Sequence, residues 1–203
     1  FHAYDPGYQV TFALMLTSAI ITCTLTTRLK DHAKMSAQAA FRTKVLFDTN
    51  QLLQKAKSEE EIFSLTASQL MKLLNRSLIV YLEQNGGLGA EQVFGVDGET
   101  AQNIFSAPEE RDAANWTFAN KKRSGAGTDS YPDAKGLYLA LRTGGGVFGV
   151  IGIDLSEKPL DAFENSVLLS ILGEGALAIE NRRNALEKEQ ATVQAKNEEL
   201  RAN

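Results

Sequence analysis

The segment LYLALRTGGGVFGVIGIDL, residues 137–155, decides the fold of this chain. Leu137 to Arg142 is apolar enough for a strand, and Thr143 to Gly146 predicts a tight hairpin turn. The following residues predict the partner strand. Alternation would place Val147, Gly149, Ile151 and Ile153 on one face, and Phe148, Val150 and Gly152 on the other. The segment therefore predicts an antiparallel strand pair, in which the glycines allow another element to come close.

Further elements surround this hairpin. Ser77 to Glu83 is rich in apolar and β-branched residues and predicts a strand, and Glu91 to Val96 predicts a second one. Pro108 to Asn120 predicts a short helix that begins with proline, and Lys121 to Gly136 predicts a long loop. A last helix is expected to begin at Pro159. This order of elements predicts an α+β fold with an antiparallel sheet and helices packed on one face.

Residues 8–85 contain neither glycine nor proline, which favours long helices. Val10 to Leu29 has about the twenty residues that cross a membrane as a helix. Seven Ser and Thr residues between positions 10 and 27 leave a buried core helix as the alternative. The basic residues after this segment predict the cytoplasmic side, and they can also contact anionic lipid. These membrane-interface residues are Arg28, Lys30 and Lys34.

The part of this run beyond the basic residues has a seven-residue apolar spacing, at Ala39, Leu46 and Leu53. It predicts either a parallel coiled-coil seam or an amphipathic helix that lies on its own domain. Ser58 to Glu61 is a capping box, in which the Ser58 hydroxyl accepts from the Glu61 amide and Glu61 reaches back. A new helix is therefore expected to begin there. Its expected buried stripe is Ile62, Leu65, Leu70, Leu73 and Leu74.

The last helix carries an apolar residue at every seventh position. These residues are Leu172, Ile179, Leu186, Val193 and Leu200. We expect residues 162–179 to pack on the domain and the rest to form a weak dimeric coil, because the companion seam positions become polar. The alternative is a free, solvated helix whose stripe is fortuitous.

Composition excludes several classes of function. The net charge is −4 with no large basic cluster, so nucleic-acid binding is not expected. One cysteine, Cys23, and two histidines give no material for a zinc site or a Ser-His-Asp triad. No catalytic residue, metal site or cofactor is therefore predicted, and this chain is not expected to be an enzyme by itself.

Four segments resemble the KdpD family of potassium-responsive sensor histidine kinases, and the 137–155 hairpin resembles the closing strand pair of a GAF domain. The segments are FHAYDPGYQVTF (1–12), TLTTRLK (24–30), RTKVLFDTNQLLQKAKSEEEIFSLTASQLMKLLNRS (42–77) and WTFANKKRSGAGTDSYPDAKGLYLAL (116–141). The resemblance implies four regions. They are a last transmembrane helix with its outer loop (1–30), a signalling helix or coil (31–57), a GAF-like sensor domain (58–180) and a coiled-coil linker helix (181–203).

The resemblance also implies a function. The chain would be the sensor and transmitter segment of a membrane-bound two-component kinase that responds to potassium limitation or osmotic stress. It would relay the signal as a homodimer in the inner membrane, with residues after Arg28 in the cytoplasm. Its partners would be a downstream kinase domain and a response regulator. His32 lacks the phosphoacceptor pattern, so this chain is not expected to autophosphorylate.

A GAF domain that binds a small ligand or ion directly is the alternative function. Family analogy places such a ligand between the sheet and the 108–120 helix, under the loop. The candidate ligand-binding residues are Trp116, Asn120, Thr128 and Tyr138. In the competing interpretation the aromatic residues are core and the loop is merely flexible.

Overall fold

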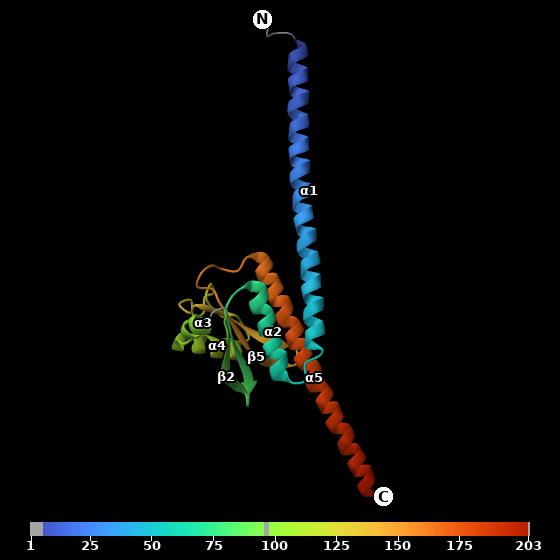
Figure 1. The fold of residues 1–203 in the computed structure, drawn as a ribbon, viewed down its shortest axis with the longest axis vertical. Coiled ribbons are helices and arrows are strands. Elements are labelled where there is room, and N and C mark those ends of the chain that lie inside the picture. Colours follow the sequence, from blue (N-terminus) through green and yellow to red (C-terminus); the bar gives the residue numbers. More distant parts are fainter. Residues whose placement is uncertain (1–5, 96–97, 203) are drawn as a thin grey trace. The chain divides into compact units, whose positions relative to one another are not determined.

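The computed structural model describes residues 6–95 and 98–202, and the side chains of residues 10–95 and 101–197. The chain forms two compact units, residues 1–44 and 45–203. The helices are α1 (Pro6–Leu53), α2 (Glu59–Leu74), α3 (Gly98–Phe105), α4 (Pro108–Asn120) and α5 (Ala162–Ala202) (Figure 1). The strands are β1 (Leu78–Gln84), β2 (Gly87–Phe94), β3 (Ser124–Gly125), β4 (Gly136–Thr143) and β5 (Gly146–Asp154).

The strands form one antiparallel sheet in the order β2-β1-β5-β4-β3. The predicted hairpin is confirmed as β4 and β5, and β5 is the central strand. The second strand begins earlier than expected, because Asn85 and Gly86 take positive φ values and reverse the chain within two residues. Its predicted end, Val96, lies outside the described residues.

Helices cover both faces of this sheet, so the expectation of helices on one face is wrong. The helices α2 and α5 bury a large cluster that includes Phe63, Leu70 and Ile171. The opposite face packs against Phe105 of α3 and Ala113 and Ala114 of α4. From the sequence, α4 was predicted but α3 was not, and all the predicted helices were placed on one face of the sheet.

A β-bulge corrects the predicted faces of β5. Leu141 pairs with Gly149, but its neighbour Arg142 pairs with Val147, so Phe148 has no direct partner. Phe148 is therefore buried in the same cluster as Ile151, on the α2 and α5 face, rather than opposite it. The glycines behave as expected: a Cβ at Gly149 would collide with Phe63, and one at Gly152 would collide with Tyr138.

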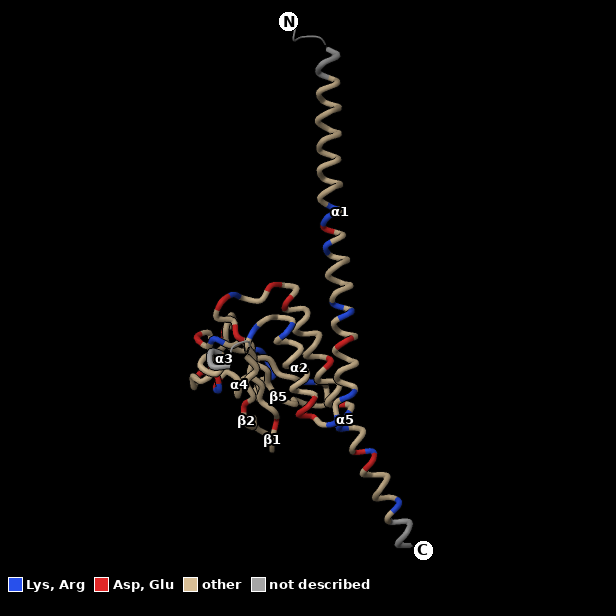
Figure 2. The backbone as a smooth tube through the Cα atoms, in the orientation of Figure 1, with Lys and Arg blue, Asp and Glu red and all other residues tan. Residues whose placement is uncertain are grey.

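The first unit is helical throughout its described residues, and its apolar side chains are exposed. Figure 2 shows no charged residue in the first part of α1, up to the cluster that begins at Arg28. Threonine hydroxyls in this part donate to carbonyls one turn back, as Thr24 does to the Ile20 oxygen at 2.8 Å. By length and composition this helix could cross a membrane. The α5 helix passes the same test, but the domain buries part of it.

Candidate functional site

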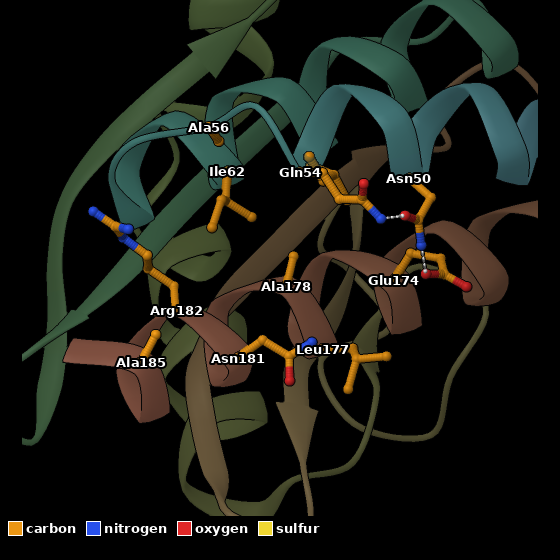
Figure 3. A pocket seen from close by; sticks show the side chains of 11 residues that line it. Asn50, Gln54, Ala56, Ile62, Glu174, Leu177, Ala178, Asn181, Arg182 and Ala185 are labelled. Carbon is orange, nitrogen blue, oxygen red and sulfur yellow. Dashed lines mark hydrogen bonds between the residues drawn. The ribbon is translucent and has the colours of Figure 1, made fainter. Parts of the chain in front are cut away.

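The C-terminal end of α1, residues 45–53, belongs to the second unit and packs into its core. Val45, Thr49 and Leu53 follow each other at four-residue spacing, so they share one face of the helix, and all three are buried. Asn50 stands beside this face and donates through Nδ2 to the Glu174 Oε2 of α5 at 3.0 Å (Figure 3). Of the two predicted alternatives, a coiled-coil seam and an amphipathic helix that lies on its own domain, residues 45–53 show the second.

The chain then turns sharply into α2, as the capping box predicts. The Ser58 Oγ accepts from the Glu61 amide at 3.2 Å, and Ser58 is the N-cap. The Glu61 carboxylate reaches back to the amide of Lys57 at 2.7 Å. The predicted stripe is largely confirmed, since Ile62, Leu70 and Leu74 are buried and Leu65 and Leu73 are partly buried. Phe63, Thr66 and Ala67, which were not predicted, are buried as well.

The helix α5 is fixed to the domain by a group of polar contacts near residue 183. Arg183 donates to both carboxylate oxygens of Glu59, at 2.7 to 3.0 Å, and lies 3.6 Å from Glu83. Its guanidinium also lies over the Phe148 ring, 4.9 Å from the centroid. The hydrogen bonds that Arg183 donates to Glu59 are the main reason that the pKa of Arg183 is raised. One arginine therefore connects α5 to α2, β1 and β5.

Two neighbouring residues extend this attachment. Arg182 donates to the carbonyl oxygen of Lys57 at 2.8 Å, just before the α2 cap. Glu180 accepts from the Thr143 hydroxyl at 2.8 Å, at the turn of the β4–β5 hairpin. We call these contacts of Glu180, Arg182 and Arg183 the α5 latch. The latch fixes α5 at the point where the helix leaves the domain.

A cavity of about 280 Å³ lies where α1 ends, α2 begins and α5 passes (Figure 3). Asn50 and Gln54 line it from the α1 side, Ile62 from α2, and Ala178 and Arg182 from α5. Gln54 donates to the Asn50 side chain at 2.7 Å, so a short polar chain runs along this cavity to Glu174.

The structure brings together two of the four predicted ligand residues. Trp116 and Thr128 line a hollow of about 750 Å³, together with the three basic residues 121–123. Asn120 does not line it and instead donates to the Trp116 carbonyl at 2.9 Å. Tyr138 is fully buried elsewhere. The hollow is therefore polar and basic, with one aromatic wall.

Tyr138 belongs to a buried network that sequence reasoning missed. Its hydroxyl donates to Glu110 at 2.7 Å, and Glu110 also accepts from the amides of Lys135 at 2.6 Å and Gly136 at 3.1 Å. Burial raises the pKa of Tyr138, and it raises the pKa of Tyr81 to about 12. These side chains fill the space between the sheet and α4 where family analogy places a ligand. Glu110 lies in the first turn of α4, where an acidic residue is common, so the sequence did not indicate that it is the acceptor of a buried network.

The remaining predicted residues separate into three groups. Arg28, Lys30 and Lys34 are exposed on α1 in the first unit. Leu172 and Ile179 are buried in the domain core, which agrees with the expectation that residues 162–179 pack on the domain. Because they are buried there, these two residues cannot also form the predicted dimer seam. Leu186 and Val193 are exposed, and the Leu200 side chain lies outside the described residues.

The chain is similar to curated KdpD sensor proteins. It is 32% identical over 204 residues to the KdpD sensor protein of Clostridium acetobutylicum, an alignment that covers 100% of this chain and 23% of that protein. It is 25% identical over 151 residues to the KdpD sensor protein of Escherichia coli K12, which covers 74% of this chain and 16% of that protein. The chain thus spans less than a quarter of each relative. No family model matches.

Solved structures show the fold. The crystal structure of the GAF domain of the potassium sensor histidine kinase KdpD from Escherichia coli superposes with a TM-score of 0.50 at 18% identity, covering 74% of this chain and 99% of that one. A GAF domain from Pseudomonas syringae pv. tomato superposes with a TM-score of 0.53 at 19% identity, covering 78% and 97%. The GAF fold is confirmed, and so is the resemblance to KdpD over the whole chain.

Proposed function

We propose that this chain is the sensor and transmitter segment of a membrane-bound two-component sensor histidine kinase that responds to potassium limitation or osmotic stress. In this proposal α1 crosses the inner membrane, and Arg28, Lys30 and Lys34 lie on its cytoplasmic side. The homodimeric GAF domain relays the signal to a downstream kinase domain, and the kinase passes it to a response regulator. The similarity to KdpD sensor proteins over the whole chain supports this assignment.

The contact between the end of α1 and α5 is the observation that carries the relay. A helix that could span a membrane ends against the helix that leaves the domain, and Asn50 and Glu174 join them. A rotation or axial shift of α1 would break this hydrogen bond and move side chains into the neighbouring cavity. Because the α5 latch fixes α5 to the domain, a shift of α1 against α5 would be passed to the part of α5 that leaves the domain.

Insertions in α5 test the relay in a full-length receptor that contains this segment. All side chains from residue 184 to 197 are exposed, so an insertion after Gln190 leaves the domain intact. One added residue rotates everything downstream by about 100°, whereas seven residues restore the phase of the heptad. We expect the single insertion to change kinase output strongly and the seven-residue insertion to preserve it. Equal output from both insertions would contradict a rotational relay.

Asn50→Ala tests the junction itself. Removing the amide leaves the Glu174 carboxylate without this partner, so we expect an altered response of kinase output to potassium limitation. Gln51→Ala is the matched control, because Gln51 is exposed on the same helix. An unchanged response in Asn50→Ala, at equal protein levels, would exclude the α1–α5 contact as the transmitting element.

The hollow beside Trp116 favours a second candidate function, the binding of an anionic ligand. Lys121, Lys122 and Arg123 are exposed around it, and Trp116 offers a ring for stacking. Trp116 is the single tryptophan of the chain, so its fluorescence reports this site. We expect adenine nucleotides to quench it and Lys122→Glu to weaken the effect. No quenching at millimolar nucleotide would eliminate this candidate.

A further inference from the structure

The helix α5 carries an apolar stripe that the domain does not cover. Leu169 and Leu177 are 43% and 46% exposed, and Gly173 lies midway between them at four-residue spacing. Residues four apart share one face of a helix, so the three form a continuous surface, which we call the 169–177 stripe. The core-facing residues of α5, such as Leu168 and Leu172, lie on another face. Leu169 and Gly173 are therefore separate from the core packing, whereas Leu177 also borders the cavity at the end of α1.

The two glycines of this helix have opposite environments. A Cβ at Gly175 would lie 2.7 Å from the Thr66 Oγ1, so the close packing of α2 on α5 explains that glycine. A Cβ at Gly173 would meet nothing within 4 Å. Glycine within a helix is less favourable than alanine, because it loses more backbone entropy on folding. Among the described residues, no packing offsets that cost at position 173, whereas the approach of a second backbone would.

The charges around the stripe suit a second copy of the same surface. In a two-fold pair each residue near the axis faces its own equivalent, so a charged stripe would repel itself. Ser166, Leu169, Gly173 and Leu177 are uncharged. The nearest acids keep their charge, but Glu174 is bonded to Asn50 of α1 and Glu180 to Thr143 at the hairpin turn.

We infer that the 169–177 stripe is the contact between two copies of this chain, with the α5 backbones closest at Gly173. This inference rests on the homodimer of the proposed function, and it moves the contact to a different face of α5. Leu172 and Ile179, the first residues of the predicted seam, are occupied by the core. The stripe replaces them within the domain and adjoins the α1–α5 cavity, which Leu177 also lines.

Disulfide cross-linking of the full chain in detergent micelles tests the contact. Cys23→Ser first removes the native thiol, and Gly173→Cys then places one thiol at the expected axis. A disulfide forms only when the two Cα atoms lie within about 7 Å, so we expect rapid dimer formation under mild oxidation. Lys72→Cys, on the exposed surface of α2, is the control and should stay monomeric on a non-reducing gel.

Charge substitution gives the second arm, read by sedimentation equilibrium. Leu177→Glu should weaken the dimer at least tenfold, because two carboxylates would face each other, while Leu186→Glu should have a smaller effect. Dimers that are lost in Leu186→Glu but kept in Leu177→Glu, without cross-linking at position 173, would overturn the stripe and leave the dimeric relay intact. A chain that is monomeric at all concentrations would overturn both.

Discussion

The two ends of α1 have similar apolar content but different surroundings. Leu16, in the first unit, is 52% exposed, whereas Leu53, in the second, is 4% exposed. The apolar side chains of the first part are exposed, and this part has the length and composition of a membrane span. The second part is buried by the GAF domain. The same helix is thus suited to two solvents, lipid and a protein core.

The threonine hydroxyls of the two parts of α1 also differ in their hydrogen bonding. Thr24 donates to carbonyls of its own helix at 2.8 and 2.9 Å, as a helix in lipid requires. Thr49 is fully buried in the second unit, and its hydroxyl has no hydrogen-bond partner. An unpaired buried hydroxyl costs free energy, so the docking of α1 on the domain is weaker than its shape allows. Weak docking would suit the proposed relay, in which α1 moves at this junction.

The largest expected effect comes from a matched pair of leucines. Leu53→Ala should destabilise the domain by about 2–5 kcal/mol, because it opens a cavity in the core. Leu16→Ala should leave the unfolding of the domain unchanged. Denaturation of the full chain in detergent micelles, followed by Trp116 fluorescence, compares the two. Equal effects would show that the two parts of α1 do not differ as described.

A charge in each part of α1 should produce the reverse pattern. Leu16→Arg places a guanidinium near the centre of the expected span and should disfavour insertion by about 2.5–3.5 kcal/mol. Leu52→Arg, on the exposed side of α1 in the second unit, should not affect insertion. A glycosylation reporter of membrane insertion measures both. Normal insertion of Leu16→Arg would argue against a membrane span.

The third prediction concerns the pH dependence of stability, and it probes only the second unit, which contains Tyr81 and Tyr138. Tyr81 has a pKa of about 12 in the fold, above its ordinary value of 10.0, and the pKa of Tyr138 is raised too. Both hydroxyls therefore stay protonated in the fold while they ionise in the unfolded chain. Stability is full below pH 10 and falls between pH 10 and 12, by about 1.4 kcal/mol per pH unit for each group.

Absorbance of tyrosinate during alkaline unfolding measures this loss. Tyr81→Phe should make the decline shallower, because it removes the buried hydroxyl whose pKa is raised. Tyr131→Phe is the control, since Tyr131 is exposed. An unchanged slope in Tyr81→Phe would show that this hydroxyl ionises as freely in the fold as in the unfolded chain.

The smallest expected effect is a gain of stability. Thr49→Val removes an unpaired buried hydroxyl with little change of shape, so the domain should become more stable by about 1 kcal/mol. Thr24→Val should not change the unfolding of the domain. Urea titration with Trp116 as the probe compares them. A loss of stability in Thr49→Val would mean that the hydroxyl has a partner, such as a water molecule.

Local signals in the sequence predicted much of this fold. The bounds of α4 agree to the residue, because Pro108 begins the helix and the chain turns at Lys121 with a positive φ. The Ser58 cap and the β4–β5 hairpin also depend on neighbouring residues alone. Such features need no knowledge of distant contacts, so one sequence is enough to find them.

One local signal was missed: Asp161 and Glu164, three residues apart, form a reciprocal cap, so α5 begins at Ala162 rather than at Pro159. Features that depend on distant contacts were missed as well. The bulge that redirects Phe148 is set by strand register, which alternation does not reveal. The partners of Glu110 lie about 25 residues away along the chain. A heptad count cannot tell Leu172, in the core, from Leu186, in solvent.

The position of Arg183 has a practical consequence for protein engineering. It is bonded to Glu59 of α2, and beyond it every side chain from residue 184 to 197 is exposed. The hydrogen bonds between α5 and the rest of the domain described above therefore end at Arg183, and Ala185 is the last residue of α5 that lines the cavity. A foreign output module can be fused at this boundary, and only the helical phase of the joint needs to be chosen.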